Sequence, residues 1–179
     1  MQPRSILAAI LPAMGLLAMG ADAADQSVPP APPAPSVPQL VGAYAAAWGS
    51  RDAARIAALH TVDTVFDLRV DGELPAIGRE AAQQRFAGIL RDNPGYSSTV
   101  RKVDFGPDFV VIEYLVAMDP QAPFRLGRIR YVPTGRSYAL PAIDVIRFRH
   151  GLVFEKVTFL DTETIRRNSR EAAIVGEAR

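Results

Sequence analysis

Three segments in the first half of the chain carry apolar residues at the spacing of an amphipathic helix. The run Ser36-Val-Pro-Gln39 fits a capping box with a proline in the first turn, so a helix is expected to begin there. Its apolar stripe repeats every three or four residues and consists of Leu40, Val41, Tyr44, Ala47 and Trp48. Asp52 is expected to cap a shorter second helix, and residues 79–91 predict a third.

The second half of the chain is expected to be mainly β-strand. Apolar runs bounded by turn residues predict strands at residues 62–70, 97–105, 109–118, 129–132, 136–149 and 152–160. Asp161 is expected to begin a short helix, and residues 169–179 are expected to form a charged tail. Helices grouped early and strands grouped late predict an α+β fold with an antiparallel sheet.

Several of these strands are apolar on both faces. In the run 109–118, one face carries Val110, Ile112, Tyr114, Val116 and Met118, and the other carries Val111, Leu115 and Ala117. A sheet covered by helices on one side should alternate apolar and polar residues. Two explanations stay open: a second copy of the chain covers the other face as a homodimer, or the sheet curls until its own ends and tail cover it.

The first 23 residues have the features of a bacterial secretory signal peptide. Arg4 precedes a long uncharged run, and Ala21-Asp22-Ala23 matches an A-x-A cleavage pattern. A membrane anchor is the alternative, but Pro12 interrupts the run and a spanning helix needs about 20 apolar residues. We therefore expect a periplasmic or secreted protein with no stable membrane anchor after cleavage. Residues 24–36 are rich in proline and predict an extended linker.

Composition excludes several classes of function. The chain has 20 Lys+Arg and 19 Asp+Glu, so it lacks the basic excess of a protein that binds nucleic acid. It has no cysteine, which excludes disulfides and cysteine-ligated metal sites. With two histidines and no Gly-rich phosphate loop or His-Glu-x-x-His motif, we expect neither a metal nor another cofactor.

Short motifs along residues 37–168 point to a known superfamily. They are Tyr44-Ala-Ala-Ala-Trp48, Arg51-Asp52, Ile56-Ala-Ala-Leu59, Asp63-Thr-Val-Phe-Asp67, Ala76-Ile-Gly-Arg-Glu80 and Ile143-Asp-Val-Ile-Arg-Phe-Arg-His-Gly151. In these motifs the chain resembles the nuclear transport factor 2-like superfamily. The resemblance implies a cone-shaped α+β fold, in which a strongly curved antiparallel sheet, mixed at its edge, wraps around three N-terminal helices. Enzymes, binding modules and assembly domains all use this fold.

Within the superfamily the chain resembles the steroid Δ-isomerases at three positions. Their oxyanion tyrosine matches Tyr44, their general-base aspartate matches Asp67, and their second, protonated aspartate matches Asp144. The resemblance implies that Asp67 moves a proton next to a carbonyl while Tyr44 and a neutral Asp144 stabilise the enolate. Between Tyr114 and Asp144 the chain is longer than those enzymes, and there it looks more like the SnoaL-like polyketide cyclases.

The residues themselves leave alternatives to these roles. Asp144 shares a strand face with Ile146 and Phe148, where burial would favour a neutral carboxyl, but it could also be ionised and paired with an arginine. Tyr44 could be a core tyrosine with a satisfied hydroxyl. Strict alternation turns Asp67 away from the apolar face of its strand, as in a solvated edge aspartate.

Two functions from different classes remain open. The first is an isomerase or cyclase that acts on a hydrophobic carbonyl compound; the second is a non-catalytic module for ligand binding or dimerisation. The hydrophobic pocket is expected to be lined by Trp48, Leu59, Phe86, Ile112, Tyr114, Ile146 and Phe148. Two other polar positions are expected to be structural: His60 as the end of the second helix, and Glu155-Lys156 as charge on a strand surface.

Overall fold

The structure is a computed structural model that describes residues 34–174. The expected signal peptide, most of the proline-rich linker and the last residues of the expected charged tail lie outside the described residues. In the part of the chain that is described, no helix is both long enough and apolar enough to cross a membrane.

The described helices begin where local capping signals stand in the sequence, except for the one after Gly78, which has no side-chain cap. Their bounds are α1 Val37–Gly49, α2 Ala53–Ala58, α3 Arg79–Asp92 and α4 Thr162–Asn168. The Gln39 side chain accepts a hydrogen bond from the Ser36 backbone N–H at 2.8 Å, which completes the expected capping box. Asp52 and Asp161 accept backbone N–H groups at the starts of α2 and α4. These helix starts are therefore confirmed.

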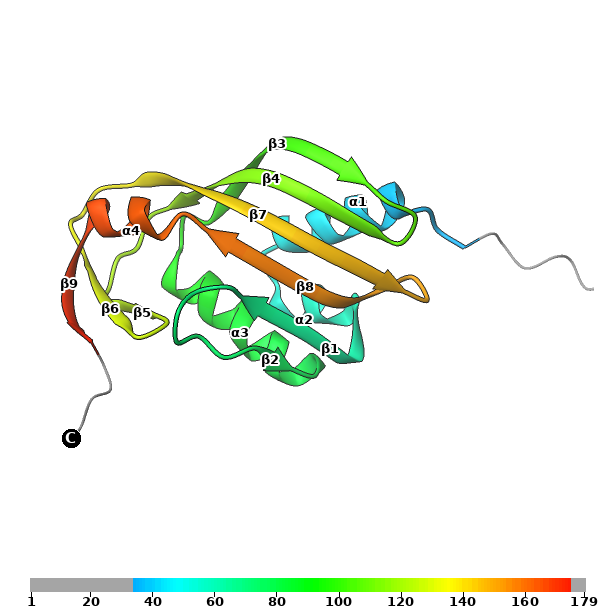
Figure 1. Ribbon diagram of the computed structural model, residues 1–179, viewed down its shortest axis with the longest axis horizontal. Coiled ribbons are helices and arrows are strands. Elements are labelled where there is room, and N and C mark those ends of the chain that lie inside the picture. The colour runs from blue at the N-terminus through cyan, green and yellow to red at the C-terminus, as the bar shows by residue number, and fades with distance from the viewer. Residues whose placement is uncertain (1–33, 175–179) are drawn as a thin grey trace, which may run out of the picture. The chain divides into compact units, whose positions relative to one another are not determined.

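Within residues 34–174, nine strands form two sheets (Figure 1). The strands are β1 His60–Leu68, β2 Ala76–Ile77, β3 Ser97–Phe105, β4 Phe109–Met118, β5 Phe124–Leu126, β6 Ile129–Pro133, β7 Tyr138–Arg149, β8 Leu152–Leu160 and β9 Ser169–Ile174. The larger sheet has the order β2-β1-β8-β7-β4-β3 and is antiparallel except where β1 pairs with β8. The expected α+β class with a mixed-edge antiparallel sheet is confirmed.

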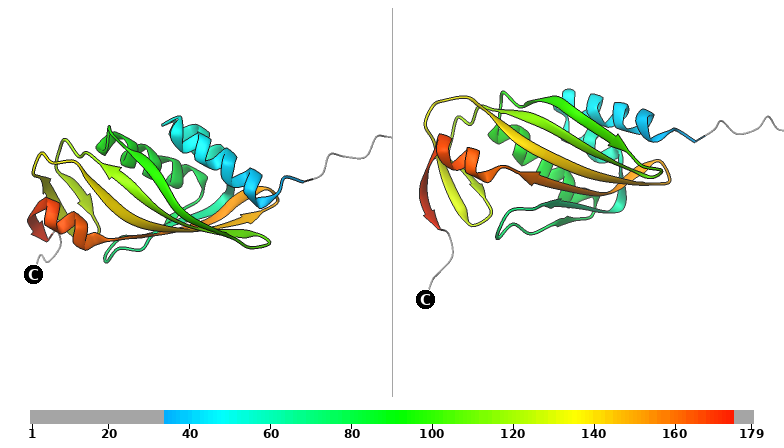
Figure 2. Two further views of the ribbon diagram at one scale, coloured as in Figure 1. Left: turned by 90° about the horizontal axis from the view of Figure 1, so that it is seen from above. Right: turned by 45° about the horizontal axis from the view of Figure 1, so that its top comes forward.

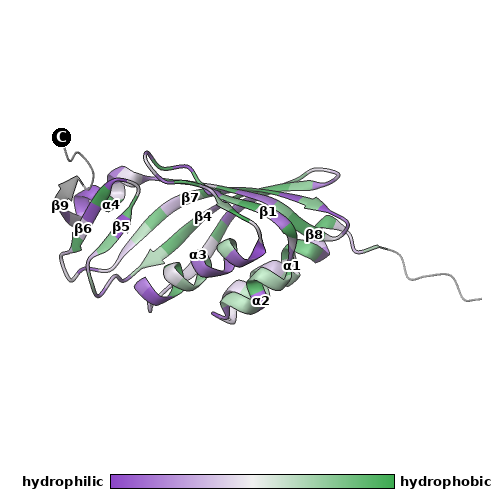
Figure 3. Ribbon diagram, turned by 90° about the horizontal axis from the view of Figure 1, so that it is seen from below, coloured by the Kyte–Doolittle hydropathy of each residue, from purple (hydrophilic) through white to green (hydrophobic). Residues whose placement is uncertain are grey.

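The large sheet is curved, and helices α1, α2 and α3 lie on its concave side (Figure 2). Strands β1 and β2 separate α2 from α3 along the chain, so these helices do not form one uninterrupted N-terminal group. Figure 3 shows hydrophobic stretches along β4 and β8. The concave side holds the core, in which Ile56, Phe86 and Ile146 are at most 1% exposed. An internal binding site would therefore lie on the concave side of the large sheet.

The convex face of the large sheet keeps apolar residues in contact with solvent. Ile143 on β7 and Phe159 on β8 are paired neighbours, with 40% and 47% of their surfaces exposed. The end of the described chain does not cover them, because β9 pairs with β6 in the smaller sheet. Self-coverage of this face by the described tail is therefore excluded, and the homodimer stays a prediction.

The smaller sheet, with the order β5-β6-β9, was not expected from the sequence pattern. Residues 169–174 belong to the segment expected to be a charged tail, and they form β9 instead. Strands β2 and β5 are only two and three residues long, too short for an alternating pattern to stand out. Backbone hydrogen bonds to a neighbouring strand hold such short or polar strands in place. The pattern of apolar residues along the sequence does not reveal this pairing.

Candidate ligand-binding site

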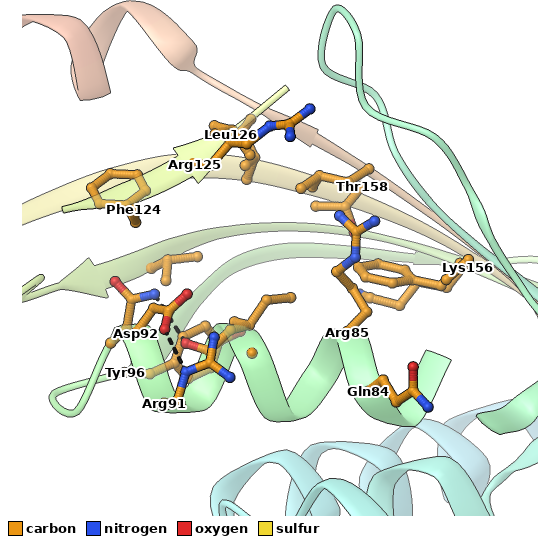
Figure 4. Close-up of a pocket in the computed structure, with 18 of the residues that line it drawn as sticks. Gln84, Arg85, Arg91, Asp92, Tyr96, Phe124, Arg125, Leu126, Lys156 and Thr158 are labelled. Carbon is orange, nitrogen blue, oxygen red and sulfur yellow. Dashed lines mark hydrogen bonds and ion pairs between the residues drawn. The ribbon is translucent and has the colours of Figure 1, made fainter. Parts of the chain in front are cut away.

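A cavity of about 630 Å³ lies between the concave side of the large sheet and α3 (Figure 4). Most of its wall is apolar and comes from Phe66, Leu68, Val116, Met118, Leu126, Leu140, Leu160 and Ile165. Small-molecule sites in proteins usually enclose roughly 300–1,000 Å³ and have mainly apolar walls. The cavity therefore has the size and lining of a site for a small organic molecule.

Buried polar side chains meet on one wall of this cavity. Tyr114, Lys156 and Thr158 line it from β4 and β8, and Asp144 lies behind them on β7. The register of the three strands sets Asp144 opposite Thr158 and near Tyr114. The Tyr114 hydroxyl donates to Asp144 Oδ1 at 3.0 Å, and the Thr158 hydroxyl donates to the same oxygen at 2.6 Å. We call these four residues the Asp144 network.

Lys156 brings a positive charge into this apolar surrounding. Its ammonium donates to Asp144 Oδ2 in an ion pair, and the residue is only 4% exposed. The same nitrogen lies 5.8 Å from the ring centroid of Tyr44 and 5.9 Å from that of Trp48, within cation–π range. One carboxylate and two aromatic faces therefore stabilise the buried charge.

This geometry corrects two expectations. Lys156 is not strand-surface charge, because alternation along β8 places it on the inner face with Thr158 and Leu160. The Asp144 carboxyl is not isolated, because the Lys156 ammonium donates to it in an ion pair; the alternative of a paired aspartate fits, with lysine in place of arginine. Strand alternation places Lys156 on the same face as Thr158 and Leu160, and this pattern in the sequence could have predicted the pair.

The tyrosines around this network remain protonated donors. Burial raises the pKa of Tyr44, Tyr96 and Tyr114 above the ordinary value, and the negative charge of Asp144 raises all three further. A neutral phenol can donate a hydrogen bond to a ligand oxygen. Among the three, Tyr96 and Tyr114 line the cavity, and the Tyr114 hydroxyl is already used by Asp144.

Tyr44 belongs to a second buried chain of hydrogen bonds. Its hydroxyl lies 3.0 Å from Nε2 of His60, and Nδ1 of His60 lies 2.9 Å from the Thr64 hydroxyl. His60 is fully buried at the start of β1, which corrects the expectation of a surface cation at a helix end. Burial, followed by the nearby charges of Lys156 and Arg79, lowers the imidazole pKa to about 3. His60 is therefore neutral in the fold.

The burial of His60 predicts a loss of stability in mild acid. An unfolded histidine titrates near pH 6.5, so below about that pH the unfolded chain takes up a proton that the folded protein excludes. This contribution to the free energy of unfolding is fully present above about pH 6.5, and it falls by about 1.4 kcal/mol per pH unit as the pH drops toward the folded-state value. Urea unfolding should show a loss of about 2 kcal/mol between pH 7 and pH 5 from this group.

Two variants separate this effect from general acid sensitivity. The substitution His60→Gln should flatten the loss between neutral and mildly acid pH, even if it lowers stability at every pH. The matched change His150→Gln, at the exposed turn before β8, should leave the pH dependence as in the wild type. An undiminished pH dependence in His60→Gln would contradict the assignment.

Asp67 lies on the side of β1 that faces away from the cavity. Its neighbours Phe66 and Leu68 line the cavity, and its own carboxylate forms an ion pair with Arg69 at 2.6 Å. Lys156 lies between the other two predicted catalytic residues, paired with Asp144 and stacked near the Tyr44 ring. The structure therefore brings Tyr44 and Asp144 close to one cation and leaves Asp67 on the opposite face of the sheet.

Two of the seven expected pocket residues, Trp48 and Tyr114, line the cavity. The other five lie in or against the hydrophobic core instead; they are Leu59, Phe86, Ile112, Ile146 and Phe148. The physical reason is an aromatic cluster that fills the space beneath α1. In it the Phe86 ring lies 5.1–5.2 Å from the rings of Phe66, His60 and Trp48.

Part of the cavity wall is formed by exposed or partly exposed polar residues that sequence reasoning did not select, and we call this part the mouth of the cavity. Gln84, Arg85, Arg91 and Asp92 come from α3, and Arg125 comes from β5 (Figure 4). No group of three histidine or acidic side chains within residues 34–174 is arranged to hold a metal ion. The polar groups that line this largely apolar cavity are arginines, tyrosines and one lysine, together with Gln84, Asp92, Asn93 and Thr158.

Comparison with known proteins identifies the family. The model of the SnoaL-like domain family matches residues 41–156. No curated protein sequence matches the chain significantly.

Solved structures share the fold at low sequence identity. A putative SnoaL-like polyketide cyclase from a Jannaschia species has a TM-score of 0.63 and 20% identity, covering 78% of this chain and 96% of its own. A hypothetical protein with a ketosteroid isomerase-like fold from Catenulispora acidiphila, in complex with trimethylamine, has a TM-score of 0.61 and 18% identity, covering 74% of this chain and 92% of its own. A putative isomerase from Bacillus subtilis has a TM-score of 0.58 and 16% identity, covering 72% and 88%. With this fold and the match over residues 41–156, the chain belongs to the SnoaL-like domain family.

Proposed function

We propose that this domain binds a small, largely apolar carbonyl compound in the cavity, with the carbonyl oxygen at Lys156. The observation that carries the proposal is a buried ammonium on the wall of an apolar cavity of about 630 Å³. Lysine has three N–H donors, and the ion pair with Asp144 accounts for one of them. A donor in a dry cavity gains much from an acceptor on the ligand, because an unpaired buried donor is costly.

The relatives support a small-molecule ligand without identifying it. The Catenulispora acidiphila protein was solved with trimethylamine, and the Jannaschia protein is named a putative polyketide cyclase. The proposal includes export after signal cleavage and a homodimer built on the exposed apolar face around Ile143 and Phe159. It also includes binding without a resident cofactor.

Isomerase or cyclase chemistry on the bound carbonyl compound is the finer form of the proposal. Lys156 and the tyrosines would stabilise negative charge on the carbonyl oxygen. Asp67 as the base stays a prediction from resemblance, and its ion pair with Arg69 outside the cavity speaks against that role. Asp144 cannot easily replace it, because Tyr114, Lys156 and Thr158 already donate to its carboxylate. The geometry thus favours binding over proton transfer.

A side chain that occupies part of the cavity should weaken ligand binding. Trp48 is the single tryptophan of the chain and lines the cavity, so its fluorescence reports on occupancy. Titration with an unconjugated ketosteroid should change this fluorescence in a saturable way, and the corresponding steroid hydrocarbon should bind about tenfold more weakly, because it offers Lys156 no acceptor. The substitution Ala81→Phe, on the cavity side of α3, should lower ketosteroid affinity at least about tenfold by occupying the space.

The matched control is Ala87→Phe, on the exposed side of the same helix, which should bind as the wild type does. Thermal unfolding of both variants checks that they fold. An equal affinity for ketone and hydrocarbon would show that the carbonyl oxygen does not bind to Lys156. If neither compound causes a saturable change in Trp48 fluorescence, the proposal is overturned. Analysis of the recovered steroid separates the classes, since a conjugated enone indicates an isomerase and an unchanged ketone indicates a binding module.

A further inference from the structure

The mouth of the cavity carries a group of cations distinct from Lys156. Arg85 extends from α3 toward the side of the cavity formed by β5, where Arg125 lies (Figure 4). Arg91 lines the cavity near the end of α3. These three arginines and Lys156 supply four positive charges to the cavity wall, and each must be matched with the carboxylates around it.

Three of the four cations have a carboxylate partner. Lys156 is paired with Asp144, and Arg91 Nε lies 2.8 Å from Asp92 Oδ1. Arg85 is paired with Glu73. Among the side chains that the structure describes, no carboxylate lies within ion-pair distance of Arg125, whose Nε donates to the Gly127 carbonyl at 2.8 Å. The cavity therefore has one positive charge in excess, and it lies at the mouth.

The partners of Arg85 and Arg125 hold the two side chains in place. Glu73 also accepts the backbone N–H of Gly127 at 2.7 Å, so one carboxylate ties α3 to the β5–β6 turn. Gly127 has φ +59, and a Cβ there would lie 2.1 Å from the Asp71 carbonyl oxygen. Only glycine fits this close approach, which fixes the turn that positions Arg125.

The two guanidinium groups act on one another. The pKa of Arg85 is lowered first by its partial burial and then by the positive charge of Arg125. This repulsion means that a negative charge near Arg125 would stabilise both groups. The remaining N–H groups of Arg125 form a planar fork that matches a carboxylate.

We propose that the ligand is an apolar acid whose body fills the cavity and whose carboxylate is bound at the mouth by Arg125, with Arg85 beside it. The inference rests on the proposed function and adds the chemical class of the ligand. A carboxylate fits better than a phosphate ester, because the excess charge at the mouth is a single one and a carboxylate carries one negative charge.

A pair of ligands with the same apolar chain, one with a carboxylate and one with an uncharged methyl ester, tests this inference. Decanoic acid and its methyl ester are titrated against the whole protein at neutral pH, with Trp48 fluorescence and calorimetry as readouts. We expect the acid to bind about tenfold more tightly than the ester, as for a charge-assisted hydrogen bond. Added salt should weaken binding of the acid and leave the ester unchanged. The substitution Arg125→Gln should remove most of the preference for the acid and leave the ester affinity unchanged.

The control Arg101→Gln makes the same charge change on exposed strand β3, away from the cavity, and should keep the preference. A second variant, Glu73→Gln with Arg85→Gln, removes both charges of this ion pair together. It should lower the affinity for decanoic acid without unfolding the protein. Equal binding of acid and ester, or an unchanged preference in Arg125→Gln, would overturn the inference while the proposed function stands. No binding of acid, ester or ketosteroid would overturn both.

Discussion

The substitution Asp144→Asn is expected to lower the free energy of unfolding by about 3–5 kcal/mol, because it leaves the buried Lys156 ammonium without a carboxylate. Asparagine at position 144 still accepts hydrogen bonds from Tyr114 and Thr158. The loss in free energy of unfolding therefore measures the contribution of the carboxylate charge. Urea unfolding at neutral pH measures it. A second change at the other partner, Asp144→Asn with Lys156→Met, should recover most of the loss, since no uncompensated charge then remains.

An exposed ion pair on the same two strands provides the control. Arg147 and Glu155 lie 3.1 Å apart on the convex side of β7 and β8, with 46% and 36% of their side chains exposed. Solvent screens such a pair, so Glu155→Gln should cost less than about 1 kcal/mol. If Asp144→Asn costs no more than Glu155→Gln, the buried lysine does not depend on Asp144, and the site as described is wrong.

The substitution Phe86→Ala should be similarly severe. Phe86 is fully buried on α3, and its ring packs against those of Trp48, His60 and Phe66. Removing a buried phenylalanine costs about 3–5 kcal/mol, from lost burial and from the void that remains. Urea unfolding measures the loss, and Trp48 fluorescence in the folded state should change because the void opens beside that ring.

The matched change is Phe105→Ala at the end of β3, where the ring is 51% exposed. It removes the same atoms from a position where little burial is lost, so its cost should be well under half that of Phe86→Ala. Similar losses in the two variants would contradict the placement of Phe86 at the centre of the aromatic cluster.

Sequence patterns predicted the elements whose signals are local. The bounds of β3, β4 and β8 agree with the expected strands at both ends, since turn residues flank each run. The capping residues Ser36, Asp52 and Asp161 each stand where a helix begins. Strand β9 was missed because its residues are mostly polar and are held by pairing with β6.

The candidate site was only partly predictable. Alternation along β1 already turned Asp67 away from Phe66 and Leu68, and the structure places it on that outer side. The same rule applied to β8 turns Lys156 inward, where it meets Asp144. Resemblance selected Tyr44 and Asp144, but it did not select the lysine that lies between them or the arginines at the mouth.

The sequence by itself determined the α+β class, the family and the start of every helix that a polar side chain caps, because these depend on neighbours along the chain. Only the tertiary structure decided which polar groups share the cavity. Register between β4, β7 and β8 brings Tyr114, Asp144 and Thr158 together, and a turn at Gly127 sets Arg125 at the mouth. Charge balance in a cavity depends on distances through space, which no pattern along the chain records.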